Sequence, residues 1–167
     1  EDYDDAKETY DKYISVLPND PAGYNNKALI YKRLKQYGEE EKLYRVALDL
    51  HPNDSTAMNN LAVNLGHQGR FDEALALMKQ LETMTPDDPY ADLHRAKIYA
   101  EKQDEAMAYV YLEKALLGMK TLDTLHHIEF RQDIRLDPSF KVLRKQQRFK
   151  ALMWRFYGTD TPLQGAP

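Results

Sequence analysis

The sequence predicts an all-α protein built from stacked helix pairs, and the main observation behind this prediction is a 34-residue period. Pro18, Pro52 and Pro86 are spaced at this period, and an Asn-Asp or Asp-Asp pair follows each of them. Bulky side chains recur at the same spacing in a second column, formed by Tyr3, Tyr37 and Phe71. A period of this length in independent columns is typical of an array of identical supersecondary units.

Each unit is predicted to contain two helices. Apolar or small residues recur at three-to-four spacing over 22–35 and again over 44–50, and Gly38 is expected to interrupt the two stretches. Proline lacks a backbone N–H, so Pro52 ends the second helix or begins the next one. Residues 53–55 (Asn-Asp-Ser) offer an N-cap for the helix that follows.

The repeated columns resemble those of the tetratricopeptide repeat. In that family a large residue is followed by a small one four positions later and by an aromatic residue or Leu three beyond. This pattern occurs twice, as Tyr24-Ala28-Tyr31 and as Met58-Ala62-Leu65. The third repeat departs from it at Asp92, Glu40 replaces a usual small residue, and Lys120 replaces a fourth proline. The resemblance implies a right-handed superhelix (α-solenoid) of antiparallel helix pairs with C-terminal capping helices.

The period and the resemblance together predict one domain over 1–158, followed by a tail or linker over 159–167. Within the domain we expect a half repeat, three full repeats and a helical cap, over 1–20, 21–54, 55–88, 89–122 and 123–158. The half repeat fits only the columns of a second helix, and a repeat cannot bury its apolar stripe alone. We therefore expect the chain to be a fragment or processed form with at least one more helix upstream.

The C-terminal segment resembles the tail that closes many bacterial tetratricopeptide domains. A Leu-Arg pair at Leu143 and an Arg-Phe pair at Arg148 lie a few residues apart, as in those tails. Pro138 stands where a first helical turn would begin. The resemblance implies that this segment caps the array.

Charge is distributed unevenly along the chain, although the net charge is only −4. Residues 1–20 hold seven acidic residues and two basic ones, whereas residues 138–158 hold six basic residues and no acidic one. Aromatic residues that interleave with the basic ones could contact RNA: Phe140, Phe149, Trp154 and Tyr157. The alternative is a solvated face on a capping helix with these aromatic side chains buried. An overall pI near 5.7 favours that alternative, so no nucleic-acid partner is expected.

The amino-acid composition excludes several classes of chemistry. The absence of cysteine excludes disulfides, thiol catalysis and cysteine-based metal centres. No apolar run approaches the roughly 18–20 residues needed to span a bilayer, so we expect a soluble protein, cytoplasmic or periplasmic, with the compartment left open. His126 and Glu129, with Asp133, could supply metal ligands, but a polar helix face explains them better. We expect no catalytic residue, no metal and no cofactor.

The resemblance implies a protein or peptide partner in a concave groove lined by the first helix of each pair. Exposed positions on those helices are the candidate contacts: Asn25, Asn26, Leu29, Asn59, Asn60, Val63, His67, Tyr90, Leu93, His94 and Lys97. Asn26 and Asn60 lie one period apart, and His94 is the third rung. An amide accepts and donates at once, so such a ladder could hold an extended peptide by its backbone. The alternative is that each Asn bonds a neighbouring helix or water.

The same positions can be compared with those that bind a known class of ligand in the family. Relatives that bind the acidic tails of heat-shock chaperones use a carboxylate clamp, and only Asn60 matches it here. The predicted function is therefore a non-catalytic interaction scaffold. Two alternatives stay open: self-assembly, in which the acidic N-terminal helix docks on the basic end of another copy, and service as a regulatory appendage of an enzyme.

Overall fold

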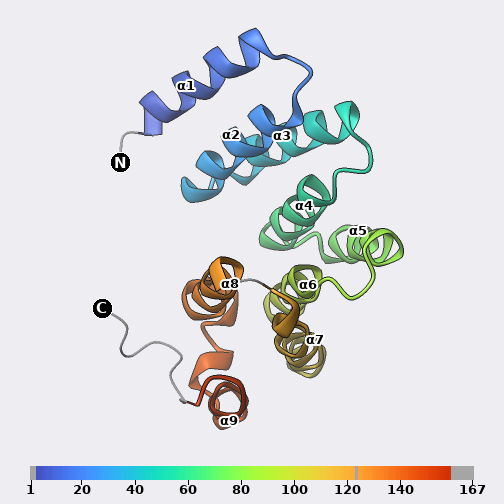
Figure 1. Cartoon of the computed structure of the whole chain (residues 1–167), viewed down its shortest axis with the longest axis vertical. Helices are drawn as coiled ribbons and strands as arrows, with labels where there is room; N and C mark the ends of the chain where they lie inside the picture. Colours follow the sequence, from blue (N-terminus) through green and yellow to red (C-terminus); the bar gives the residue numbers. More distant parts are fainter. Residues whose placement is uncertain (1–2, 123, 159–167) are drawn as a thin grey trace. The chain divides into compact units, whose positions relative to one another are not determined.

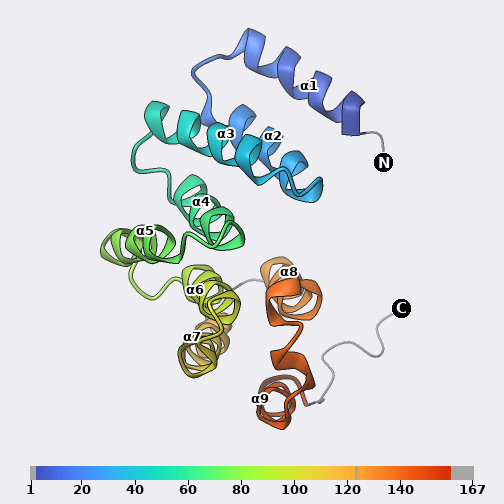
Figure 2. The same ribbon diagram turned by 180° about the vertical axis from the view of Figure 1, so that it is seen from behind.

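The computed structural model describes residues 3–122 and 124–158, and all regular structure in those two stretches is helical. The α-helices are α1 (Tyr3–Val16), α2 (Pro21–Arg33), α3 (Tyr37–Leu50), α4 (Ser55–His67), α5 (Phe71–Met84), α6 (Pro89–Glu101), α7 (Glu105–Gly118), α8 (Thr124–Leu136) and α9 (Gln147–Tyr157). Short 3-10 helices are η1 (Met119–Thr121), η2 (Pro138–Phe140) and η3 (Leu143–Lys145). Consecutive helices pack as antiparallel pairs, α2 with α3, α4 with α5 and α6 with α7, which confirms the predicted fold class (Figures 1 and 2).

The chain divides into two compact units, Glu1–Thr85 and Pro86–Pro167, where the sequence predicted a single domain over 1–158. Unit 1 contains α1–α5, and unit 2 contains α6–α9 with the 3-10 helices. The predicted tail over 159–167 lies outside the described residues.

The first helix of each pair begins at an aspartate of the repeat period. Asp20, Asp54 and Asp88 occupy the N-cap positions of α2, α4 and α6. Each carboxylate accepts a hydrogen bond of 2.9 Å from a backbone N–H two residues later. A cap of this kind stabilises a helix by about 1 kcal/mol. The Asp column therefore repeats because every first helix needs the same start.

The inner turn of each pair uses a residue in the left-handed region. Lys35, Gly69 and Gln103, which are again one period apart, have φ of 57°, 75° and 64°. The interruption expected at Gly38 therefore lies three positions earlier, at Lys35, and Gly38 itself is in the first turn of α3. Glycine reaches this conformation without a Cβ clash, whereas lysine and glutamine adopt it at a cost.

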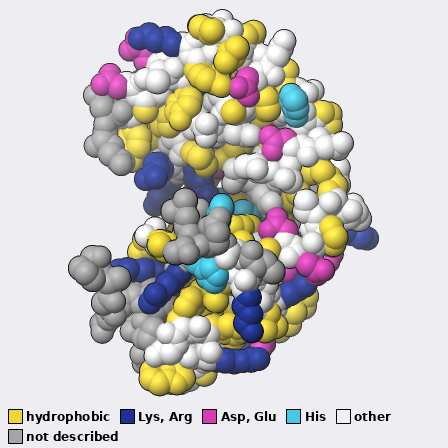
Figure 3. All heavy atoms as spheres, in the orientation of Figure 1, with side chains coloured by type: hydrophobic (Ala, Val, Ile, Leu, Met, Phe, Trp, Pro, Cys, Tyr) yellow, Lys and Arg dark blue, Asp and Glu magenta, His cyan; other side chains and the backbone are white. Residues whose placement is uncertain are grey.

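In unit 1 the core consists of the periodic small and large residues. Its buried members include Ala28, Tyr44, Ala47, Met58, Ala62, Leu65, Ala74, Met78 and Leu81. Helix α1 packs on α2 at close range, because a Cβ on Gly23 would lie 2.8 Å from Cδ1 of Tyr13. None of the fourteen side chains of α1, all of them described, is buried. Val16 at its end is 75% exposed, and Figure 3 shows hydrophobic side chains on the surface there.

In unit 2 the pair α6 and α7 shares its core with the C-terminal segments. Aromatic and aliphatic residues from those segments join it: Phe130, Ile134, Phe140, Leu143, Phe149 and Met153. Helix α9 ends at Gly158, whose φ of 68° provides a left-handed C-cap. The expectation that Trp154 is buried was wrong, since its side chain is 62% exposed.

Two acidic residues are buried where the resemblance expects other side chains. Glu40 lies in α3 next to buried Tyr44, and neither its Oε2 nor the Tyr44 hydroxyl meets the hydrogen-bond criteria with any other described residue. Burial raises the pKa of Glu40, and the nearby charges of Lys32 and His67 only partly oppose it. Asn64 also hydrogen-bonds to the carboxylate, but one buried oxygen remains unpaired among the described residues, which makes Glu40 costly for unit 1.

Asp92 in α6 is better supported than Glu40. Its carboxylate lies 3.1 Å from Nη1 of Arg95 and 3.3 Å from Nζ of Lys114. Burial nevertheless raises its pKa, because the two cations do not fully offset the loss of water. The departure at this position thus replaces an apolar contact between α6 and α7 with an ionic one.

Candidate functional site

The candidate contacts of unit 1 that reach the surface lie on α2 and α4. Asn26 and Leu29 are exposed on α2, and Asn60 is half-buried on α4. Neither the Asn26 nor the Asn60 side chain makes a hydrogen bond with another described residue. Both amides of the predicted ladder are therefore available to an outside partner.

Three other candidates in unit 1 were expected to be exposed and are not. Asn25 is 9% exposed, and its Nδ2 donates a hydrogen bond of 3.0 Å to Oδ2 of Asp54, the N-cap of α4. Asn59 is also buried, and Val63 is 2% exposed. Asn25 therefore joins consecutive repeats, and Val63 cannot form a surface pocket without repacking.

His67 occupies an intermediate position. Its imidazole stacks on the ring of Tyr37, with ring centroids 5.1 Å apart and an interplanar angle of 27°. The contact joins the end of α4 to the start of α3. His67 is half-buried, and one face of its ring packs on Tyr37.

In unit 2 the candidates lie on α6, and two of them were wrongly expected to be exposed. Leu93 belongs to the hydrophobic core. Lys97 is 2% exposed, with Nζ 2.7 Å from Oδ2 of Asp133 and 3.1 Å from Oδ2 of Asp137. These carboxylates lie in α8 and at the N-cap of η2, so Lys97 anchors the C-terminal segments to α6.

Tyr90 and His94 of α6 are half-buried. The Tyr90 ring meets Phe130 edge-on at 5.4 Å, and its hydroxyl donates a hydrogen bond of 3.2 Å to the carbonyl oxygen of His126. Tyr90 thus packs against α8, and His94 also has interactions within the protein. The third rung of the ladder is therefore less available than the first two.

The partners that Asn25 and Lys97 find in the fold carry no signal in the sequence that links them to these two residues. Asp54 was recognised as a helix cap, but nothing in its column indicated a second bond through the other carboxylate oxygen. Asp137 is separated from Lys97 by more than one repeat period, so the repeat pattern does not link the two residues. An Asp before Pro138 was the available signal, and it indicated only a cap.

The metal ligands weighed in the sequence, His126, Glu129 and Asp133, lie on α8. Within residues 3–122 and 124–158, no group of three or more metal-ligating side chains comes together. Asp133 is bonded to Lys97, and the side chain of Glu129 lies outside the described residues. In the same stretches, none of the helices is both long and apolar enough to cross a membrane.

Comparison with known proteins gives matches to the repeat region. Two family models, each described as Tetratricopeptide repeat, match residues 33–98 and 9–42. The chain is 31% identical over 88 residues to the poly-beta-1,6-N-acetyl-D-glucosamine export protein of Escherichia coli K12, which covers 52% of this chain and 11% of that protein. It is 27% identical over 107 residues to sperm-associated antigen 1 of Rattus norvegicus, covering 64% of this chain and 12% of the antigen. The chain thus matches about a ninth of the length of these relatives.

Proposed function

Because this chain is a tetratricopeptide-repeat protein, we propose that it is a non-catalytic scaffold that binds a peptide segment of a protein partner. The repeats indicate a protein–protein interaction scaffold in general. The proposed peptide site is the exposed face of α2 and α4 in unit 1. The two relatives have names of unrelated kinds, which supports a shared binding architecture over a shared activity.

This proposal rests on the accessibility of the Asn26 and Asn60 side chains and on their lack of hydrogen bonds to other described residues. Both amides are one period apart on first helices, both reach the surface, and neither bonds another described residue. Within the described part of the chain, neither amide is therefore occupied by a hydrogen bond to a neighbouring helix. Each can accept from a peptide N–H and donate to a peptide C=O at the same time.

The magnitudes indicate how much of the affinity these amides supply. At about 1 kcal/mol net per hydrogen bond, two amides contribute at most a few kcal/mol. Micromolar binding requires about 8 kcal/mol. Leu29, 40% exposed beside Asn26, provides apolar surface for the remainder, whereas buried Val63 and Leu93 do not. We expect a peptide with apolar side chains next to the backbone that the amides hold.

Peptide-display panning on the parent and on an Asn26→Ala/Asn60→Ala variant tests the proposal. A matched control is Asn19→Ala/Asn53→Ala, since these two exposed amides also lie one period apart but occupy the loops before α2 and α4. We expect peptides that the parent and the control enrich and the ladder variant does not. Equal enrichment by all three proteins would contradict the proposed site.

Self-association through α1 is a second candidate. Its support is the apolar end of α1, where Val16 and Leu17 are exposed. The acidic residues of α1 give less support than the sequence suggested, because Asp4, Glu8 and Asp11 already pair with lysines of unit 1. Sedimentation velocity over a concentration series tests it, and a constant monomer mass would exclude it.

A further inference from the structure

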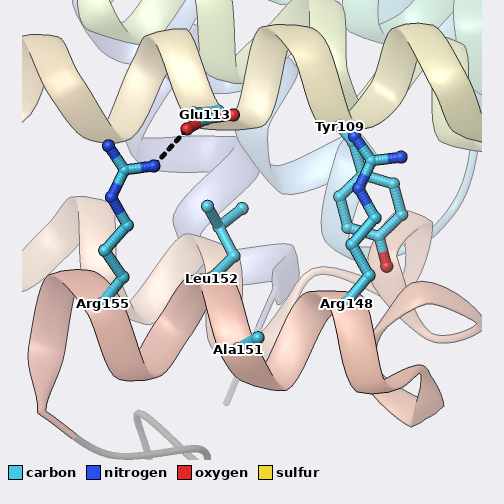
Figure 4. A pocket seen from close by; sticks show the side chains of 6 residues that line it. All are labelled: Tyr109, Glu113, Arg148, Ala151, Leu152 and Arg155. Carbon is cyan, nitrogen blue, oxygen red and sulfur yellow. Dashed lines mark hydrogen bonds and ion pairs between the residues drawn. The ribbon is translucent and has the colours of Figure 1, made fainter.

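We propose that a pocket between α7 and α9 in unit 2 binds the C-terminal carboxylate of a peptide together with its last, aliphatic side chain. The pocket has a volume of about 230 Å³ and lies between two helices whose other faces form the core of unit 2. Its walls are Tyr109 and Glu113 of α7 and Arg148, Ala151, Leu152 and Arg155 of α9 (Figure 4). It shares no residue with the α2 and α4 face, so it does not rest on the function proposed above.

The two arginines stand at opposite ends of the pocket. Arg148 and Arg155 are seven positions apart, about two helical turns, and therefore lie on the same face of α9. Figure 4 shows both guanidinium groups reaching toward α7, with Leu152 and Ala151 between them. The spacing makes a cleft with charged ends and an apolar floor.

Arg148 is the side chain of the pocket whose N–H groups are available to a ligand. Its guanidinium carbon lies 4.2 Å from the centroid of the Tyr109 ring, which places the cation over the ring face. It makes no hydrogen bond or ion pair with another residue in the described part of the chain. The hydroxyl of Tyr109 donates to Oε1 of Gln146 at 2.8 Å, so the ring under Arg148 is fixed. Stacking on a ring leaves the N–H edge of a guanidinium free to bind an anion.

The charges of the pocket select a single negative charge. Two arginines and one glutamate give its walls a net charge of +1. Arg155 already pairs with Glu113, so one guanidinium remains for a ligand. A carboxylate matches a guanidinium fork with two parallel hydrogen bonds. A phosphate carries more charge and would face the carboxylate of Glu113 from within the same small pocket.

The C-terminal segment adds positive charge around the pocket, while Glu105 of α7, which accepts a hydrogen bond of 2.8 Å from Nε2 of Gln146, adds one negative charge near Tyr109. Residues 138–158 contain six basic residues and no acidic one. Lys141 and Lys145 are exposed, and Figure 3 shows Lys and Arg side chains on the surface over this part of unit 2. A local positive field raises the association rate of a negatively charged peptide end.

The apolar floor determines which carboxylate fits. Leu152 is four positions from Arg148, so the two side chains are neighbours on the helix surface. A ligand must therefore present a carboxylate and an apolar group within one residue of each other. A C-terminal aliphatic residue carries both on the same carbon, whereas an internal Asp or Glu would require the peptide backbone to cross the pocket.

The test is a titration of the ¹⁵N-labelled full chain, followed by ¹H–¹⁵N correlation spectra, with N-acetyl-leucine at pH 7. We expect saturable shifts of the Ala151 and Leu152 amides and of the Arg148 Nε–H, with a Kd on the order of 1 mM for so small a probe. N-acetyl-leucinamide has the same side chain without the charge, and we expect it to bind about tenfold more weakly or less.

Variants separate the pocket from the general positive field. We expect Arg148→Gln to weaken N-acetyl-leucine binding about tenfold, since a charge-assisted pair is lost. Arg148→Lys keeps the charge, loses the fork, and is expected to fall between the parent and Arg148→Gln. Lys145→Gln removes the same charge from the same segment outside the pocket and should leave binding unchanged within about twofold.

Four results would overturn the proposal. The first is equal binding of the amide, which would make the pocket merely apolar. The second is tighter binding of inorganic phosphate than of N-acetyl-leucine, which would assign the site to phosphorylated or nucleic-acid ligands. The third is an unchanged Kd in Arg148→Gln, and the fourth is no saturable shift at all. Panning on the α2 and α4 face reports on other residues, so the two proposals can fail separately.

Discussion

Replacing Lys97 by methionine is expected to destabilise unit 2, because the ammonium group of Lys97 is the buried partner of two carboxylates. Burial opposes its charge, yet attraction by Asp137 and Asp133 outweighs burial and raises the pKa of Lys97. Methionine keeps most of the side-chain volume while removing the charge. The change therefore isolates the ionic contact from packing.

The magnitude follows from the exposure of the two carboxylates. Removing one partner of a buried ion pair costs about 3–5 kcal/mol, because the other charge is left without compensation. Asp133 is 46% exposed and can be hydrated, whereas Asp137 is only 10% exposed and cannot. One stranded carboxylate points to the lower limit, about 3 kcal/mol. For a chain of this length that loss lowers Tm by about 6–12 °C.

The ion pair between Lys97 and Asp137 also predicts that the free energy of unfolding decreases at acidic pH. Although burial opposes it, Lys97 and the hydrogen bonds from Ser139 lower the pKa of Asp137 from 3.8 to about 2. A depressed carboxylate pKa stabilises the fold above pH 3.8, and that stability is lost as the pH falls from 3.8 toward 2. The difference corresponds to about 2 kcal/mol. In Lys97→Met this acid-dependent loss should be much smaller.

Urea unfolding followed by circular dichroism at pH 7 and pH 3 measures both effects. The set comprises the parent, Lys97→Met, Asp137→Asn, the double variant, and Lys145→Met as a control for loss of an exposed lysine. We expect the double variant to lose less than the sum of the singles, with a coupling of at least about 1 kcal/mol. Strictly additive losses, or a Lys97→Met loss below about 1 kcal/mol, would refute the reasoning.

Three further predictions concern unit 1, all measured by chemical denaturation or hydrogen exchange. Glu40→Gln should stabilise the protein by about 1–3 kcal/mol at pH 7 and less at pH 4, because the raised pKa of Glu40 makes its ionised form destabilising as pH rises above 4.5; an equal gain at both pH values would contradict this. Gly23→Ala should speed hydrogen exchange in α1 by crowding it, while Gly38→Ala, with open space around its Cβ, should not. Lys35→Gly should stabilise by up to about 1 kcal/mol, since φ is 57° there, and a loss would show that the lysine side chain contributes more than its strain costs.

The sequence predicted the helix pairs well because the period has local causes. An Asp N-cap and an apolar stripe at three-to-four spacing act within a few residues, so they can be recognised without the fold. The inner turn was misplaced to Gly38 because glycine is the usual sign of a break, whereas the left-handed residue there is Lys35. A lysine at that position gives no local signal.

Exposure of the candidate contacts was harder to predict, because a first helix has neighbours on more than one side. Helical periodicity identifies the apolar stripe that packs on the second helix of the same pair. It does not reveal which of the remaining positions the following segments cover. Leu93 and Lys97 were assigned to a groove for this reason, and both are buried in unit 2, Lys97 by carboxylates that lie more than one repeat period away in the sequence.

The bond between Asn25 and Asp54 gives unfolding in unit 1 a direction. Oδ1 of Asp54 accepts from two backbone N–H groups at the start of α4, and Oδ2 accepts from Asn25 in α2. If α2 detaches, α4 keeps its cap and loses only a side-chain partner. If the start of α4 frays, however, Asn25 is left buried with neither end bonded, because its Oδ1 already has no partner among the described residues. Fraying at the start of α4 would therefore remove the bond of Asn25 together with the cap of α4, whereas loss of α2 would leave that cap intact.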